Sequence, residues 1–146
     1  MSTYWRRLQF KVPGEPRGKG RPRFTRTGRA YTDEKTAAYE NLVRLAFDQK
    51  YDTWEPTKNP VKVDIIARCA PPKSWSERKK GRAYKDEIRK VTKPDCDNIV
   101  KAVLDGLNKT AWMDDTQVID IRCRKHYWPS GELWVDIWVE EEDEDD

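Results

Sequence analysis

Apolar and polar positions alternate in four stretches of the chain and recur with helical spacing in two others. Alternation is typical of strands that bury one face, and it predicts strands at residues 5–12, 61–69, 117–128 and 133–139. Apolar positions three and four residues apart predict helices at residues 33–49 and 98–108. Residues 129–131, Pro-Ser-Gly, predict a turn that joins the last two strands in a hairpin. This order of elements predicts one small α+β domain, a mixed sheet of about four strands packed with two main helices.

Three segments lack this periodicity. Residues 13–31 contain four Gly and three Pro, which predicts a basic loop without regular structure. Residues 70–94 are polar and predict a flexible loop with a short helix at residues 74–80. The last seven residues, 140–146, are all acidic, and such a run is typically disordered and solvated. We therefore expect the folded domain to occupy residues 1–139.

The chain carries 29 Lys and Arg against 26 Asp and Glu, but the two signs are unevenly distributed. Residues 1–31 include nine cations and one acid. This excess favours a polyanionic partner such as nucleic acid, although a charged solvated surface explains it equally well. In residues 18–23 cations alternate with Gly and Pro, which lets the backbone approach phosphates. We expect DNA contacts from five loop residues: Lys19, Arg21, Arg23, Arg26 and Arg29.

The remaining composition excludes several classes of site. The three cysteines lack any CxxC spacing, which argues against a zinc site, and His126 is the only histidine, which excludes a multi-histidine site. No apolar run is long enough for a membrane helix, and the N-terminus lacks the apolar core of a signal peptide. We expect a cytoplasmic protein with reduced thiols, no membrane contact and no small-molecule cofactor.

Two pairs of aspartates stand out against this basic background. In KPDCDN, residues 93–98, Asp97 has the position of a helix N-cap, which leaves Asp95 unexplained. Asp97, Lys101 and Asp105 share one helical stripe, which ordinary surface ion pairs would also produce. In WMDDTQV, Asp114 and Asp115 precede a strand, and a turn would explain one of them.

Three carboxylates with few other ligand types suit Mg²⁺ or Mn²⁺, provided that the final hairpin brings the second pair back beside the helix start. A bound metal could activate a water for attack on a phosphodiester, and Lys101 could stabilise the charge that develops.

The stretch KPDCDNIVKAVLDGLNKTAWMDDTQV, residues 93–118, resembles the RusA-type Holliday junction resolvases of bacteria and their prophages. The basic segment 18–32, the helix that follows it and PPKSW at 71–75 are also similar, so the resemblance covers about residues 8–139. It implies that Asp95, Asp97 and Asp115 are the catalytic metal-binding acids and that Lys101 is an additional catalytic residue. It further implies a Mg²⁺-dependent homodimer that cuts four-way junctions by paired nicks in DNA recombination and repair.

Other functions remain compatible with these residues. One is a metal-dependent nuclease of flaps or single strands. Another is a non-catalytic DNA-binding module in which the aspartates only cap helices and turns. A third is a protein-interaction module that uses the last strand and the acidic tail. Phe24 and Tyr31, in the basic loop, either stack on bases or are buried in the core.

Overall fold

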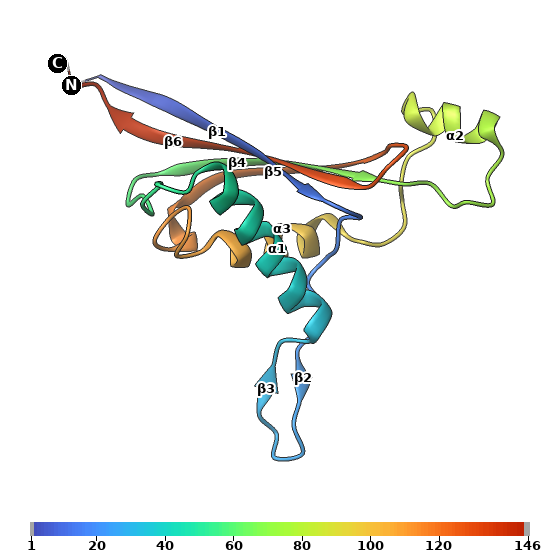
Figure 1. Cartoon of the computed structure of the whole chain (residues 1–146), viewed down its shortest axis with the longest axis horizontal. Coiled ribbons are helices and arrows are strands. Elements are labelled where there is room, and N and C mark those ends of the chain that lie inside the picture. The colour runs from blue at the N-terminus through green and yellow to red at the C-terminus, as the bar shows by residue number, and fades with distance from the viewer. Residues whose placement is uncertain (1, 145–146) are drawn as a thin grey trace.

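The computed structural model describes residues 2–144 and contains a four-stranded mixed sheet, which confirms the predicted α+β class. The strands of this sheet are β1 (Thr3–Pro13), β4 (Val61–Cys69), β5 (Val118–Tyr127) and β6 (Glu132–Glu142). The helices are α1 (Glu34–Lys50), α2 (Glu77–Tyr84) and α3 (Cys96–Leu107), and a 3₁₀ helix, η1 (Asp115–Gln117), precedes β5. Two short strands, β2 (Arg23–Phe24) and β3 (Ala30–Tyr31), form a hairpin that projects from the body (Figure 1).

The strand order is β1-β6-β4-β5, so the predicted hairpin of the last two strands is wrong. β5 pairs with β4 in parallel, and β6 pairs with β4 and β1 in antiparallel fashion. The chain bends at residues 129 and 130, but the segment after Tyr127 passes the end of β4, where the Trp128 N–H donates to the Cys69 carbonyl at 2.9 Å. As a consequence, β5 lies at an open edge of the sheet.

One face of the sheet forms the core. Alternate residues of β1, β4 and β6 are buried on this face, which α1 and α3 cover (Figure 1). The two helices approach closely at Gly106, where a Cβ would lie 2.8 Å from the Glu40 carbonyl oxygen. The opposite face carries tryptophans with cations stacked over them, such as Lys62, whose Nζ lies 4.2 Å from the Trp5 ring centroid.

The segments without periodicity are more ordered than predicted. The β2–β3 hairpin lies within residues 13–31 and closes through a Thr25 N–H bond to the Arg29 carbonyl, with Gly28 at a φ of +83°. In the second polar segment, α2 begins after its Ser76 cap, later than the predicted helix. No helix within residues 2–144 is long and apolar enough to cross a membrane.

The acidic C-terminal segment was expected to be disordered from residue 140, and this is wrong for its first three residues. β6 continues to Glu142 because β1 begins at Thr3 and pairs with it along its whole length. Tyr4 Oη donates to Glu141 Oε2 at 2.9 Å, and Arg6 lies 3.8 Å from the same carboxylate. Asp145 and Asp146 lie outside the described residues.

Candidate active site

The first turn of α3 presents two carboxylates to solvent. Asp95, not Asp97, takes the N-cap position, and the Ile99 N–H donates to its carbonyl at 3.0 Å. The Asp95 side chain nevertheless makes no capping hydrogen bond, and Asp97 lies in the first helical turn. The partial positive charge of the helix N-terminus offsets part of the repulsion between the two carboxylates. The predicted cap was therefore wrong by two residues, and both carboxylates are available to bind a ligand.

Lys101 lies one turn beyond Asp97 on the exposed side of α3. Asp105, the next member of the predicted stripe, instead binds Lys19 Nζ, which also lies 3.6 Å from Glu40 Oε1. Lys19, predicted to contact DNA, therefore has its ammonium group directed at two carboxylates of the protein. This ion-pair cluster fastens the basic segment to α1 and α3.

The two aspartates before β5 have different surroundings. Asp114 caps η1 and accepts a hydrogen bond from the Thr116 N–H at 3.0 Å, which lowers its pKa. Asp115 Oδ1 accepts a hydrogen bond from Nε1 of the buried Trp112 at 2.8 Å. Burial raises the pKa of Asp115, although the Trp112 hydrogen bond opposes this shift. A turn thus explains Asp114, whereas nothing in the turn requires Asp115.

The structure does not bring all three predicted ligands together within one protomer. Asp95 and Asp97 lie at the start of α3, whereas Asp115 follows its end, and 12 helical residues span about 18 Å. The charged groups that shift the pKa of Asp115 are Asp105, Asp114 and Lys109, none of which belongs to the helix start. Within residues 2–144 no group of three or more His, Cys, Asp or Glu is placed to hold a metal ion.

Carboxylates are the donors that Mg²⁺ prefers, so the donor chemistry fits this ion. The arrangement of these donors in a single protomer does not fit it.

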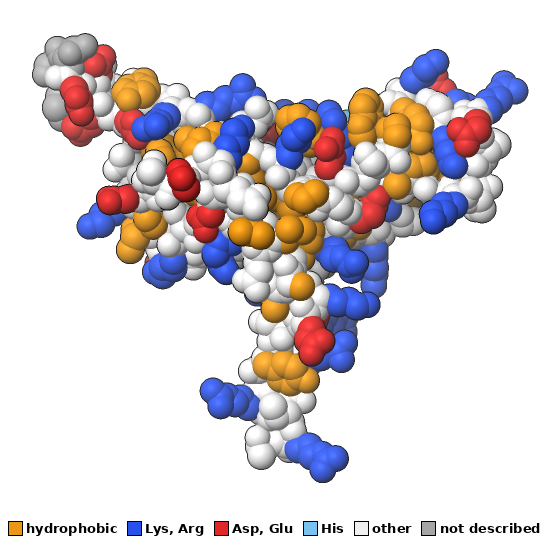
Figure 2. Space-filling model, viewed as in Figure 1, with side chains coloured by type: hydrophobic (Ala, Val, Ile, Leu, Met, Phe, Trp, Pro, Cys, Tyr) orange, Lys and Arg blue, Asp and Glu red, His pale blue; other side chains and the backbone are white. Residues whose placement is uncertain are grey.

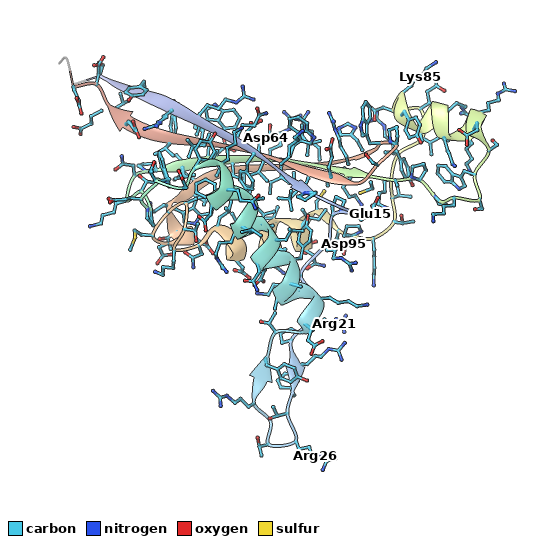
Figure 3. The ribbon with its side chains drawn as sticks, in the orientation of Figure 1. Glu15, Arg21, Arg26, Asp64, Lys85 and Asp95 are labelled. Atoms are coloured by element: carbon cyan, nitrogen blue, oxygen red, sulfur yellow. The ribbon has the colours of Figure 1, made fainter. Side chains whose placement is uncertain are left out.

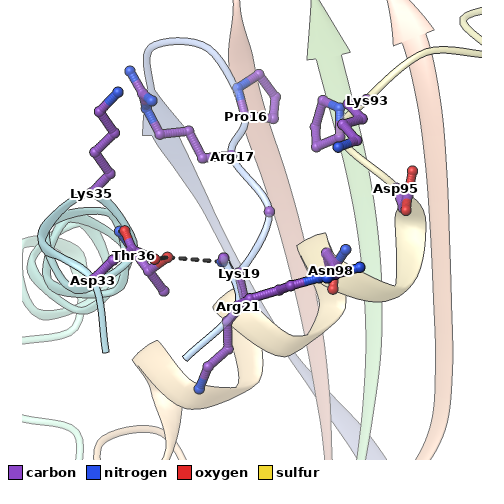
Figure 4. A pocket seen from close by; sticks show the side chains of 13 residues that line it. Pro16, Arg17, Lys19, Arg21, Asp33, Lys35, Thr36, Lys93, Asp95 and Asn98 are labelled. Atoms are coloured by element: carbon purple, nitrogen blue, oxygen red, sulfur yellow. Dashed lines mark hydrogen bonds between the residues drawn. The ribbon is translucent and has the colours of Figure 1, made fainter. Parts of the chain in front are cut away.

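A basic cleft of about 600 Å³ adjoins the start of α3. Arg17 and Lys35 lie on one side of it, and Lys93 and Asp95 lie on the other (Figure 4). Lys93 directly precedes Pro94 and Asp95 in the sequence. Nothing in the sequence singled out Lys35, because it lies beside the cleft only through the position of α1 next to α3. Sequence reasoning therefore did not single out these three cations as candidate phosphate contacts.

Backbone contacts hold the cleft in shape. The Lys19 N–H donates to the Asn98 carbonyl at 2.9 Å, and the Gly20 N–H donates to Thr36 Oγ1 at 2.9 Å. A Cβ at Gly18 would lie 2.8 Å from Asn98 Cβ, so the chain can approach α3 this closely only without a side chain there. Gly18 therefore allows this segment to pack closely against α3.

The other predicted DNA-contacting residues are spread from the cleft to the hairpin. Arg21 lines the cleft, whereas Arg23 and Arg29 lie in the projecting hairpin and Arg26 lies at its tip (Figure 3). Figure 2 shows Lys and Arg side chains along this arm. Phe24 is 68% exposed, which excludes its burial in the core.

Comparison with known proteins places the chain in a family. The model of the family described as endodeoxyribonuclease RusA matches residues 13–138. An uncharacterized protein of Bacillus subtilis (strain 168), YqaN, is 37% identical over 139 residues, which cover 92% of this chain and 96% of that protein. This chain belongs to the endodeoxyribonuclease RusA family.

Proposed function

We propose that the protein is a Mg²⁺-dependent, homodimeric endonuclease that resolves Holliday junctions by paired symmetrical nicks, with Mn²⁺ as a possible substitute ion. One observation carries the proposal: Asp95 lines a basic cleft and makes no side-chain capping hydrogen bond, and Asp97 follows it in the first turn of α3. A carboxylate pair would repel DNA unless a cation lay between them. A site for a divalent cation beside a phosphate-binding cleft removes that conflict.

Asp95, Asp97 and Asp115 are the proposed metal ligands. A divalent ion would polarise the phosphodiester and lower the pKa of a bound water, although one protomer does not bring the three carboxylates together within its described residues. Lys101 is the proposed additional catalytic residue, because its ammonium group can stabilise negative charge that develops on the phosphate. Trp112 is a positioning residue, since its indole N–H holds one oxygen of Asp115.

The proposed DNA contacts are the cleft cations Arg17, Arg21, Lys35 and Lys93, together with the hairpin arginines. Contacts of this kind bind phosphates and fix the position of the duplex without reading its sequence. A four-way junction presents two equivalent strands, which suits a two-fold symmetric enzyme with two sites. Junction shape should therefore govern binding more strongly than base sequence.

A substrate panel tests this proposal. A labelled four-way junction, a flap, a single strand and a linear duplex would be incubated with the wild type and with Asp97→Asn. The exposed Asp48→Asn on α1 is the matched control, because it removes the same charge far from the cleft.

The proposal predicts paired nicks in the junction, lost in Asp97→Asn but not in the control, while junction binding persists in both. Preferential cutting of flaps or single strands would instead favour the broader metal-dependent nuclease. Salt-sensitive binding without cleavage in either Mg²⁺ or Mn²⁺ would favour the non-catalytic module.

A further inference from the structure

A second basic surface lies outside the cleft, in the segment that joins β4 to α3. This segment, residues 70–94, carries nine Lys and Arg against three acids, and we call it the α2 arm after the helix at its centre. α2 lies beyond the end of the sheet, away from the β2–β3 hairpin (Figure 1), and Lys and Arg side chains gather around it (Figure 2). Such an excess of positive charge attracts a polyanion.

Contacts with the sheet hold the α2 arm in place. Ala83 is fully buried, and the ring centroid of Trp75 lies 5.3 Å from that of Tyr127 at the end of β5. Just after α2, Asp86 Oδ1 lies 2.8 Å from His126 Nδ1. The arm is therefore an ordered platform, and its cations project from fixed positions in the fold.

The acids of the α2 arm already have partners within the protein. Lys80 Nζ lies 3.4 Å from Glu77 Oε1, and Arg82 Nε donates to Glu87 Oε2 at 3.2 Å. The third acid is the partner of the histidine on β5. Because all three carboxylates face a cation or a histidine, their repulsion of a nearby phosphate is weakened.

Two cations project from the outer face of α2. Arg78 and Lys85 are both exposed and are seven residues apart, so they lie on the same side of the helix, opposite the buried Ala83. Two turns of α-helix span about 10.5 Å, which is close to three steps of about 3.4 Å along one DNA strand. These two side chains can therefore bind phosphates of the same duplex.

The α2 arm and the hairpin extend from different sides of the candidate site. In Figure 3, Asp95 at the start of α3 lies between Lys85 of the arm and Arg26 at the hairpin tip. A duplex that follows the cleft and the hairpin would have to bend to reach α2 as well, and bending a short duplex by 40–90° costs about 1–6 kcal/mol. A four-way junction has duplex arms that leave the branch point in different directions, so it can occupy both surfaces without this cost.

We propose that the α2 arm binds the phosphates of a second duplex arm of branched DNA, through Arg78 and Lys85, while the cleft and the hairpin hold the first. This inference rests on the proposed function for the identity of the substrate. It goes further by naming a surface that distinguishes branched from linear DNA before any bond is cut. Since the contacts are with phosphates, the preference is for the shape of the DNA and not for its sequence.

Neutralising the outer face of α2 tests the proposal. Arg78→Gln combined with Lys85→Gln removes two charges and keeps residues of similar helix propensity. Lys50→Gln combined with Lys58→Gln is the matched control, because both lysines are exposed and Lys58 precedes β4, whereas the arm follows its other end. Fluorescence anisotropy in a chelator, which prevents metal-dependent cleavage, gives the affinity for a four-way junction and for a linear duplex at several salt concentrations.

The double variant of α2 should lower the slope of log affinity against log salt by about two for the junction and leave it unchanged for the duplex. At about 0.15 M salt this corresponds to roughly thirtyfold weaker junction binding, because each phosphate contact contributes about 0.9 to the slope. The control should bind both substrates like the wild type. An unchanged junction affinity, an equal loss for junction and duplex, or an equal loss in the control would overturn the proposal.

A gain of affinity provides a second test, which misfolding cannot mimic. Glu87→Gln releases Arg82, whose Nε donates to that carboxylate at 3.2 Å, so this arginine becomes available to a phosphate. Junction binding should become about fivefold tighter at about 0.15 M salt, with no change for the duplex. Glu55→Gln, which removes an exposed acid in the loop before β4, is the control and should bind like the wild type. Junction binding by Glu87→Gln that is no tighter than that of the control would contradict the proposal.

Binding and cutting are measured separately in these experiments. Junction binding that depends on the α2 arm, without cleavage in Mg²⁺ or Mn²⁺, would overturn the proposed function and leave the α2 contacts standing. Paired nicking by the double variant of α2, with unchanged junction affinity, would overturn the α2 contacts and leave the proposed function standing.

Discussion

Replacing Lys19 by Met should destabilise the fold without weakening the DNA contacts, contrary to what its place in a basic loop suggests. Lys19 Nζ binds Asp105 and lies 3.6 Å from Glu40 Oε1, and the Lys19 and Glu40 side chains are only 29% and 17% exposed. The hydrogen bond to Asp105 raises the pKa of Lys19, and burial raises the pKa of Glu40. In the Met variant, two partly buried carboxylates face each other without a cation.

The magnitude follows from the partial burial of the cluster. Removing one partner of a fully buried ion pair costs about 3–5 kcal/mol. Solvent screening of this partly exposed cluster reduces the expected loss to about 2 kcal/mol. For a domain of this size that corresponds to a fall of roughly 4–8 °C in Tm. Lys19→Met combined with Asp105→Asn should lose less than the sum of the two single variants.

Urea unfolding measures the stability loss, and fluorescence anisotropy with a labelled junction at several salt concentrations measures the DNA contacts. Lys19→Met should leave the slope of log affinity against log salt unchanged. Arg26→Ala at the hairpin tip is the control, and it should reduce this slope by about one without changing stability. A stable Lys19→Met protein with a reduced salt slope would refute the reasoning and make Lys19 a phosphate contact.

Three further predictions concern other parts of the molecule. Phe24→Ala should weaken junction binding by about 1–3 kcal/mol if the exposed ring stacks on a base, while urea unfolding stays unchanged; equal quenching of 2-aminopurine at the branch point by variant and wild type would exclude stacking. Trp112→Phe should weaken Mn²⁺ binding, measured by calorimetry, because Asp115 loses its indole partner; unchanged affinity would show that the hydrogen bond does not orient this carboxylate. Glu132→Gln should lower stability only above acidic pH. The Trp134 indole N–H lowers the folded-state pKa of Glu132, so its contribution is present above the unfolded pKa and is lost as pH falls through the folded value. Urea unfolding as a function of pH would contradict this if wild type and variant differed equally in strong acid.

Local sequence pattern was sufficient for most of the elements. β4 and β6 bury every second residue, and the apolar stripe of α3 packs on the sheet. The spacing of apolar residues was therefore enough to predict which face of each element is buried. The β5–β6 pairing could not be predicted in this way. A turn after Tyr127 is compatible with either neighbour, and insertion of β4 between the two strands is decided by contacts that are distant in sequence.

For the candidate site too, the sequence identified residues but not their positions relative to one another in space. The resemblance of residues 93–118 to a known family singled out Asp95, Asp97 and Asp115 as proposed ligands. Their spacing did not reveal that α3 separates Asp115 from the other two. The contributions of Arg17 and Lys35 to the cleft were also hidden, because they depend on how α1 starts relative to α3. The sequence could not decide whether Phe24 is buried in the core, and only its exposure in the structure excluded this.

The central claim is that this chain cuts branched DNA with the help of a divalent cation. The most direct test is incubation of the wild type with an end-labelled four-way junction, with Mg²⁺ or with a chelator, followed by mapping of the cut positions on all four strands. The account predicts Mg²⁺-dependent nicks at symmetrical positions on two opposing strands and no cutting of a linear duplex of the same sequence. An intact junction under saturating binding in Mg²⁺ and in Mn²⁺ would contradict it.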